Sequence, residues 1–125
     1  MFSIHKTLRK GKPPHLPFLR IKEAVLGKKY DLSLVFIGNT KSKSLNKKYR
    51  NRNKSANILS FPFSENDGEI FIDLKEARKN SKNFSREYEN FVAFLFIHGL
   101  FHLKGFAHGS KMESEEKKVR KKFNI

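Results

Sequence analysis

Residues 91–108 read FVAFLFIHGLFHLKGFAH, and this stretch decides most of what the sequence predicts. Its first part is apolar on most sides, which favours a buried helix that we expect from about Arg86 to Leu103. Gly105 then ends the helix, because glycine adopts backbone conformations that larger residues resist. We therefore expect one long buried helix in the core of the fold.

Three of the five histidines in the chain fall in this stretch. His98 and His102 are four residues apart, so a helix places both rings on one face, where they can share a cation. The turn at Gly105 can bring His108 back toward them. Three imidazoles leave a fourth tetrahedral position open, as in catalytic zinc sites, and such a metal lowers the pKa of its bound water toward about 7. The pattern predicts a metal-dependent hydrolase with one zinc ion per chain.

The spacing H-x3-H-x5-H is also that of the metzincin zinc proteases, so a protease is the rival interpretation. Those enzymes need a glutamate directly after the first histidine, where it takes the proton of the metal-bound water. This chain has Gly99 at that position. The peptidase mechanism lacks its proton acceptor, and we expect another kind of hydrolase.

The charge of the chain favours a polyanionic partner. Its 125 residues include 27 Lys and Arg against 12 Asp and Glu, a formal net charge of +15. Neutralising phosphates releases condensed counterions, so this excess favours nucleic acid, although biased genomic base usage is an alternative explanation. From Leu32 through Ser64 there is no acidic residue, and this block holds seven basic ones: Lys41, Lys43, Lys47, Lys48, Arg50, Arg52 and Lys54.

The composition excludes several other classes of protein. The chain has no cysteine, which rules out disulfides, thiolate ligands and a cysteine nucleophile. Thirteen Phe and 38% hydrophobic residues supply a core, unlike a disordered basic tail. The longest apolar run, Phe91 to Ile97, is too short to span a bilayer, and the N-terminus lacks signal-peptide features. We expect a cytoplasmic protein that does not associate with membranes.

The remaining pattern predicts one α+β domain over residues 1–125. Four strands are expected, at Phe2–Lys6, Tyr30–Ile37, Ile58–Phe61 and Glu69–Asp73. Pro62 should end the third strand, and Asn66-Asp67-Gly68 should turn into the fourth, so that the two form a hairpin or lie side by side. Helices are expected at Leu16–Leu26, in a short basic segment capped by Gly38-Asn39-Thr40, and at Met112–Phe123. Gly27 should end the first helix, and a basic turn through Gly11–Pro14 should precede it.

The histidine segment and two further blocks resemble the YbeY family of bacterial rRNA-maturation endoribonucleases. The pattern H-G-x-x-H-L-x-G-[YF]-x-H runs from His98 to His108. Ser44-Leu45-Asn46-x-x-Tyr49-Arg50, followed by NILSFPF at residues 57–63, resembles the family's other signature. Gly68-Glu69-Ile70 matches its Gly-Asp-Ile strand opening. In order and spacing, the resemblance covers about Leu32 to Phe123.

The resemblance implies a mixed sheet of about four strands packed with helices, and one zinc ion bound by His98, His102 and His108. It implies a single-strand-specific endoribonuclease that acts in 16S rRNA 3′-end maturation and ribosome quality control. Its partners would be single-stranded RNA and the ribosomal small subunit or its assembly factors. The family's functionally important arginine falls on Arg50, whose guanidinium can bind two oxygens of a phosphodiester transition state. The other basic residues of the block would guide RNA: Lys41, Lys43, Lys47, Lys48, Arg52 and Lys54.

Two departures from the family pattern bear on activity more than on fold. Ala107 stands where most relatives carry Asp, and Ser55-Ala56-Asn57 replaces Pro-Thr-Asp or Pro-Thr-Asn. Loss of an aspartate that orients a ligand or shuttles a proton lowers metal affinity or rate.

No general base is evident, since Glu69 and Asp67 fit a strand end and a turn. The alternative function is that of a ribosome-assembly factor that binds pre-rRNA and whose zinc is weakly catalytic or structural. A third possible function is that of a metal-dependent hydrolase of another substrate, although the basic block argues against small neutral molecules as substrates.

Overall fold

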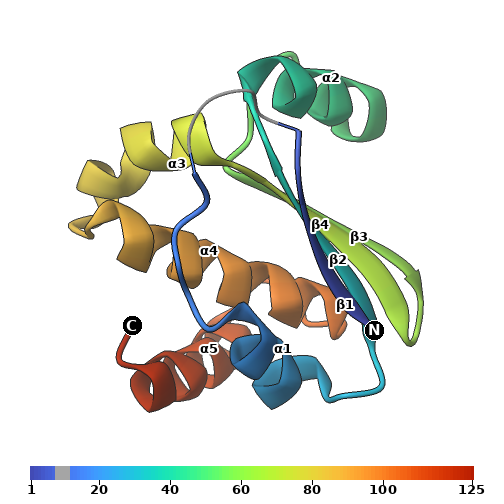
Figure 1. Ribbon diagram of the computed structural model, residues 1–125, viewed down its shortest axis with the longest axis vertical. Helices are drawn as coiled ribbons and strands as arrows, with labels where there is room; N and C mark the ends of the chain where they lie inside the picture. Colours follow the sequence, from blue (N-terminus) through green and yellow to red (C-terminus); the bar gives the residue numbers. More distant parts are fainter. Residues whose placement is uncertain (8–11) are drawn as a thin grey trace.

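Four strands form the sheet on which the rest of the chain packs (Figure 1). The structure is a computed structural model that describes residues 1–7 and 12–125. The strands are β1 (Phe2–Lys6), β2 (Asp31–Ile37), β3 (Ile58–Ser64) and β4 (Asp67–Asp73), in the order β1-β2-β4-β3. β2 pairs in parallel with both β1 and β4, whereas β3 pairs antiparallel with β4. The predicted mixed sheet of four strands in an α+β domain is confirmed.

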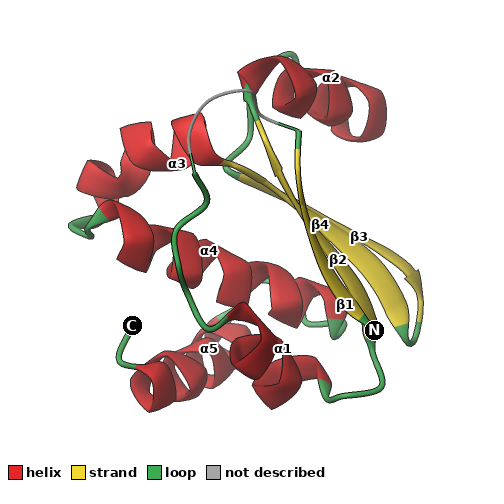
Figure 2. Cartoon of the chain, viewed as in Figure 1, coloured by secondary structure: helices red, strands yellow, loops and turns green. Residues whose placement is uncertain are grey.

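The helices are distributed unequally over the sheet (Figure 2). They are α1 (Phe18–Leu26), α2 (Asn39–Arg50), α3 (Leu74–Asn80), α4 (Tyr88–Leu103) and α5 (Ser110–Phe123), with a 3₁₀ turn at Ser81–Phe84. α1, α3, α4 and α5 cover one face, and α2 lies at one end of the sheet. Within residues 1–7 and 12–125, no helix has both the length and the apolar character needed to cross a membrane.

The long buried helix expected at the centre of the fold is α4. It begins at Tyr88 instead of Arg86, because the preceding Glu87 still has an extended backbone, with φ −69° and ψ 156°. Six of its side chains have no exposed surface: Phe91, Val92, Ala93, Phe96, Ile97 and Leu100. Burying one of the larger of these side chains contributes about 1.5–3 kcal/mol. The core between α4 and the sheet is therefore a main source of stability.

At Gly99, α4 lies very close to the sheet. A Cβ atom at this position would lie 2.7 Å from Cδ1 of Ile58 and 2.9 Å from Oγ of Ser60. The Ser60 hydroxyl donates to the carbonyl oxygen of Gly99 across 3.4 Å. This tight contact with β3 and β4 fixes the rotation of α4 about its own axis, and with it the direction of the neighbouring His98.

Two predicted strand boundaries, the end of β3 and the start of β4, differ from the structure. β3 does not end at Pro62 but continues to Ser64. β3 is an edge strand that pairs only with β4. Proline has no N–H to donate, but on an edge strand its nitrogen can face solvent, so the strand can continue through it. β4 begins at Asp67, inside the predicted turn.

The helix boundaries also shift at their starts. α1 begins at Phe18 instead of Leu16, and α5 at Ser110 instead of Met112. Gly27 follows α1 with a φ of +84°, as expected of a terminating glycine. The predicted turn at Gly11–Pro14 begins outside the described residues.

α3 was not predicted from the sequence, because its segment is short and mostly polar. It is set by Asp73, the last residue of β4, whose buried side chain accepts a hydrogen bond from the Glu76 backbone N–H at 3.0 Å. The side-chain amide of Asn39 donates to the other oxygen of Asp73 at 2.5 Å. Asn39 therefore does not cap its own helix with its side chain but joins the start of α2 to the start of α3.

Candidate metal centre

α4 and the loop after it bring the three predicted histidines together. Each offers one ligand atom, and these atoms all lie within 4.8 Å of one another. Nε2 of His98 lies 3.0 Å from Nε2 of His102. The ring centroid of His108 lies 5.2 Å from that of His98 and 4.5 Å from that of His102. Zinc binds imidazole nitrogens at about 2.0–2.1 Å, so donors this close together can hold one metal ion.

The return of the chain toward α4 depends on Gly105. Its φ of +102° lies in the region that glycine favours, and its N–H donates to the His102 carbonyl oxygen at 3.0 Å. The Phe106 N–H donates to the carbonyl oxygen of Phe101 at 3.1 Å, and the two rings pack edge to face with centroids 5.5 Å apart. These contacts hold the loop that presents His108.

Glu116 holds the other nitrogen of His98. Its Oε1 atom lies 2.8 Å from Nδ1, and the side chain is buried in α5. A carboxylate behind a metal-binding histidine fixes the tautomer and the ring orientation. With Nδ1 occupied, Nε2 is left to face the other rings. Glu116 was missed in the sequence, although its i, i+4 spacing from Met112 could have shown that the two share one face of α5.

The environment of His102 favours its neutral form. Burial lowers the pKa of His102, and the adjacent His98 and His108 lower it further. A backbone hydrogen bond to Phe106 and the charge of Glu116 act in the opposite direction. Because a histidine binds metal as the neutral imidazole, the lowered pKa keeps His102 available as a ligand at neutral pH.

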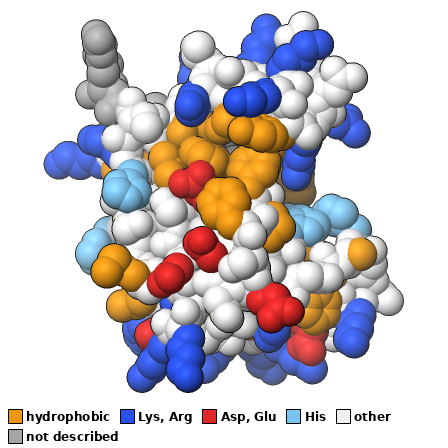
Figure 3. All heavy atoms as spheres, turned by 90° about the vertical axis from the view of Figure 1, so that its right-hand side faces the viewer, with side chains coloured by type: hydrophobic (Ala, Val, Ile, Leu, Met, Phe, Trp, Pro, Cys, Tyr) orange, Lys and Arg blue, Asp and Glu red, His pale blue; other side chains and the backbone are white. Residues whose placement is uncertain are grey.

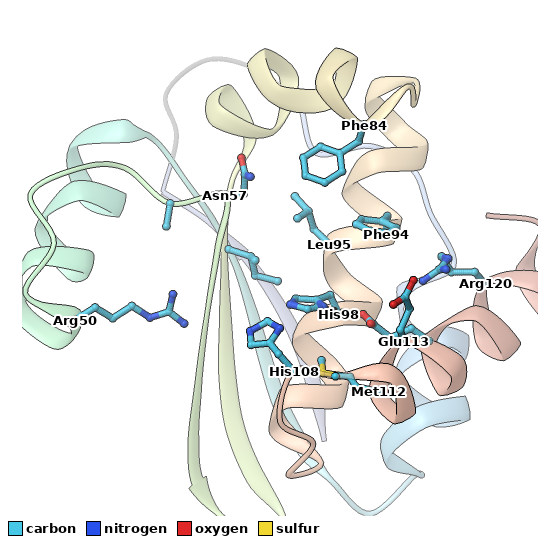
Figure 4. A pocket seen from close by; sticks show the side chains of 14 residues that line it. Arg50, Asn57, Phe84, Phe94, Leu95, His98, His108, Met112, Glu113 and Arg120 are labelled. Atoms are coloured by element: carbon cyan, nitrogen blue, oxygen red, sulfur yellow. Dashed lines mark hydrogen bonds and ion pairs between the residues drawn. The ribbon is translucent and has the colours of Figure 1, made fainter.

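His98 and His108 open onto a cavity of about 530 Å³ (Figure 4). Arg50, the last residue of α2, lies across this cavity with its guanidinium pointing toward them. Among the described residues, Arg50 is in no ion pair, and its side chain is exposed. Part of the remaining wall is apolar: Ile58, Phe84, Phe94, Leu95 and Met112. A cationic group thus faces a potential metal site across a partly apolar space.

The position of Arg50 depends on the loop that follows α2. The buried Ser42 hydroxyl donates to the Ala56 carbonyl oxygen at 2.9 Å, and the amide of Asn46 donates to the Lys54 carbonyl oxygen at 2.9 Å. Ala56 also lines the metal cavity. The unusual Ser55-Ala56-Asn57 segment is therefore tied to the helix that carries Arg50.

The other predicted RNA contacts surround α2 without reaching the histidines. All six are exposed: Lys41, Lys43, Lys47, Lys48, Arg52 and Lys54. Arg52 and Lys54 line a second hollow of about 410 Å³, which shares Arg50 with the metal cavity.

The acidic residues near the histidines differ from those considered in the sequence. Glu69 and Asp67 do not line the metal cavity, whereas Glu113 and Glu116 of α5 do. A carboxylate therefore contacts the histidine cluster even though Ala107 replaces the family's aspartate.

Comparison with known proteins agrees with this arrangement. The family model described as Endoribonuclease YbeY matches residues 16–124. The chain belongs to this family. It is 36% identical over 97 residues to Endoribonuclease YbeY of Thermodesulfovibrio yellowstonii, covering 72% of this chain and 60% of the relative. It is 30% identical over 136 residues to the Clostridium botulinum protein of the same name, covering 84% and 82%.

The YbeY-family chain thus matches less than two thirds of the length of the Thermodesulfovibrio yellowstonii relative. For the Nautilia profundicola Endoribonuclease YbeY, the match is 31% identical over 102 residues and covers 73% of the relative. A Thermotoga maritima protein of known solution structure has the same fold, with a TM-score of 0.69 over 99% of this chain and 92% of that one, at 22% identity.

Membership of the YbeY family agrees with the packing at Gly99. In a metzincin protease, the residue after the first histidine is the glutamate that takes a proton. Here that position is pressed against Ile58 and Ser60 of β3, where even a Cβ atom would be too close. A protease glutamate at this point of α4 would have to displace the side chains of Ile58 and Ser60.

Proposed function

We propose that this chain is a zinc-dependent endoribonuclease that cleaves single-stranded RNA. The observation that carries the proposal is the single cavity that has His98 and His108 on one side and Arg50 on the other (Figure 4). Cleavage of a phosphodiester builds negative charge on its oxygens, and a guanidinium can bind two of them at once. The relatives named Endoribonuclease YbeY support the same chemistry.

The proposed metal is one zinc ion per chain, with His98, His102 and His108 as its ligands. Imidazole donors suit zinc, and three of them leave a position open to the cavity. A bound zinc ion supplies Lewis acidity that activates water and withdraws charge from a phosphoryl oxygen. The chain's own side chains do the rest: Glu116 orients His98, and Arg50 holds the phosphate.

The exposed basic residues around α2 are the proposed contacts to the RNA backbone. They are Lys41, Lys43, Lys47, Lys48, Arg52 and Lys54. Each phosphate contact to a single strand adds about 0.7 to the slope of log affinity against log salt concentration. RNA binding should weaken steeply with salt, and replacing two of these lysines by glutamine should make the dependence shallower.

The proposed cellular role is rRNA processing in the cytoplasm. It comprises maturation of the 16S rRNA 3′ end and ribosome quality control, with the ribosomal small subunit or its assembly factors as partners. The support is family membership together with the three sequence blocks that resemble the family, among them the block that carries Arg50.

The test compares zinc content and cleavage of a labelled single-stranded RNA in the wild type and two variants. His102→Ala should lose both zinc and cleavage. Arg50→Ala should keep zinc and the fold but lose about 10²–10³-fold in rate, as when a group that stabilises transition-state charge is removed. The matched control is Arg20→Ala, since the Arg20 side chain is exposed on α1 and does not line the cavity; this variant should cleave normally. Cleavage that survives both substitutions would come from a contaminating nuclease, and the proposal would fail.

The second candidate is a ribosome-assembly factor that binds pre-rRNA and uses zinc mainly for structure. Ala107 favours it, because a lost aspartate can weaken a site while sparing the fold. The same experiment separates the two functions. Wild-type protein that holds zinc and binds RNA but cleaves no single strand would support the assembly factor.

A further inference from the structure

A separate groove, lined mainly by aromatic rings, lies on the face of the sheet opposite α4. Ser60 of β3 contacts Gly99 of α4, so its chain neighbour Phe61 projects from the other face. The groove has a volume of about 240 Å³ and is lined by side chains of α2, β3 and β4, among them Leu45, Tyr49, Phe61, Phe63, Glu69 and Phe71. Figure 3 shows hydrophobic side chains gathered below a part of the surface rich in Lys and Arg.

Two rings of this aromatic groove are open to solvent, and the other two, Phe61 and Phe71, are partly buried. Tyr49 is 56% exposed and Phe63 is 63% exposed. Phe61 lies between Tyr49 and Phe71, with ring centroids 5.0 and 5.8 Å away. α1, α3, α4 and α5 all lie on the other face (Figure 2). A contiguous exposed apolar surface of this kind typically marks a binding site.

The charges beside the aromatic groove favour a polyanion. Lys41, Leu45 and Tyr49 are spaced by four residues and therefore share one face of α2. The Nζ atom of Lys48 lies 5.2 Å from the centre of the Tyr49 ring. Cations thus stand beside exposed aromatic rings, which is the combination that proteins use to bind single-stranded nucleic acid.

Two elements, α2 and β3, contribute residues to both the aromatic groove and the metal cavity. Tyr49 lines the groove, and the next residue of α2, Arg50, lines the cavity. On β3, Phe61 lines the groove and Ile58 lines the cavity. Because β3 is an edge strand, an extended polymer that bends around it can meet both the groove and the cavity.

Glu69 places a carboxylate in the aromatic groove. Among the described residues, this carboxylate forms no ion pair. A carboxylate repels phosphates but accepts hydrogen bonds from the amino and imino groups of bases. The bases should therefore face the rings, and the phosphates should face Lys41 and Lys48.

We infer that the aromatic groove is a base-stacking platform for the single-stranded RNA whose phosphate reaches Arg50. The inference rests on the proposed function and extends it to the path of the substrate. Aromatic side chains stack on bases of any sequence, so the groove selects unpaired RNA over a duplex, whose bases are already stacked.

The test measures binding by fluorescence anisotropy with a labelled 2′-O-methyl RNA of about ten nucleotides, a typical length for such sites. An abasic oligonucleotide of equal length keeps the phosphates but cannot stack. Tyr49→Ala and Phe63→Ala should each weaken binding of the base-containing strand about tenfold and leave binding of the abasic strand unchanged. Tyr49→Phe keeps the ring and should bind like wild type. Leu19→Ala, at an apolar side chain of α1 that is 50% exposed, is the matched control.

A spectroscopic measurement reports on stacking itself. The chain has three tyrosines and no tryptophan. Tyr30 is only 3% exposed and Tyr88 is partly buried, whereas Tyr49 is 56% exposed, so Tyr49 is the tyrosine most accessible to quenching by RNA. RNA should quench wild-type emission more strongly than that of Tyr49→Phe. Comparing the two proteins at the same RNA concentration removes the effect of light absorbed by RNA.

The outcomes separate this inference from the proposed function. Equal affinity of wild type and Tyr49→Ala for the base-containing strand would overturn the platform. Cleavage of RNA by the wild type would leave the nuclease proposal intact in that case. If the platform variants lose base-dependent binding but wild type cleaves no RNA, the platform stands and the nuclease proposal fails.

Discussion

Oε1 of Glu116 and Nδ1 of His98 lie 2.8 Å apart, so a buried carboxylate of α5 holds a histidine of α4 from behind. The contact links two helices that the sequence separates by the loop carrying His108. It also places the charge of Glu116 beside the candidate metal centre. The strength of metal binding should therefore depend on a residue that is not itself a proposed ligand.

Substitution of Glu116 should weaken zinc binding without removing a proposed ligand. Glu116→Gln keeps the shape of the side chain but loses its charge, and zinc affinity should fall about 10–100-fold, as is typical for partners of ligating histidines. Competition with a chromophoric chelator measures the affinity. Glu115→Gln, at the adjacent position of α5, is the matched control and should bind zinc like wild type. Equal affinities in all three proteins would show that the contact does not orient His98.

Zinc should stabilise the folded protein through the histidine cluster. A ligand that binds only the folded state adds about 2.7 kcal/mol at a free concentration of 100 Kd, so excess zinc should raise the Tm of the wild type. His102→Ala should show no such rise, whereas His5→Ala on exposed β1 should respond like wild type. Differential scanning fluorimetry with and without zinc measures the shift. An equal rise in His102→Ala would place the metal elsewhere.

Gly99→Ala should destabilise the fold even though alanine is the better helix former. The added Cβ atom would lie 2.7 Å from Cδ1 of Ile58, and overpacking of this kind costs about 1–3 kcal/mol against a helix-propensity gain of about 1 kcal/mol. Urea unfolding measures the difference. Ser114→Ala on the exposed surface of α5 is the control for propensity alone.

A second substitution tests the cause of that loss. Ile58→Val removes the Cδ1 atom that the added methyl group would meet. The loss of stability in the double variant Gly99→Ala/Ile58→Val should therefore be smaller than the sum of the losses in the two single variants. Simple additivity of the two losses would contradict the close contact between α4 and β3.

The metal-free protein should lose stability in mild acid because of His102. Burial lowers the pKa of His102 in the folded state, and His98 and His108 lower it further, so the unfolded chain binds the proton more readily. The contribution to stability is complete above the unfolded pKa of about 6.5 and is lost as the pH falls through the lower folded value. Urea unfolding in the presence of a chelator, between neutral pH and mild acid, should show a smaller decline for His102→Gln. An identical decline would assign the effect to other groups.

Much of the fold could be predicted from local pattern. The apolar run around Phe91 and Ile97 predicted α4, and the alternating segment that ends at Ile37 predicted β2. In such stretches, the spacing of apolar residues along the chain indicates the type of element directly. The end of β3 was predicted wrongly, since whether Pro62 ends a strand depends on which neighbour lies beside it. α3 was missed because its start depends on the buried Asp73 and not on a strong apolar repeat.

The sequence by itself determined that the three histidines lie close together. His98 and His102 share a helix face by spacing alone, and Gly105 allows the turn that returns His108. Their role as metal ligands stays a prediction, as does the role of Arg50. The family resemblance, carried by three ordered blocks, is confirmed by the match over residues 16–124.

Only the tertiary structure decided what surrounds the histidines. Packing of α5 on α4 brings Glu116 to His98, and the loop after α2 places Arg50 across the same cavity. The pairing of β3 with β4 determines that Phe61 faces the aromatic groove instead of the core. The physical reason is range: helix spacing and turn chemistry act between near neighbours in the chain, whereas these contacts follow from how separate elements bury their apolar surfaces together.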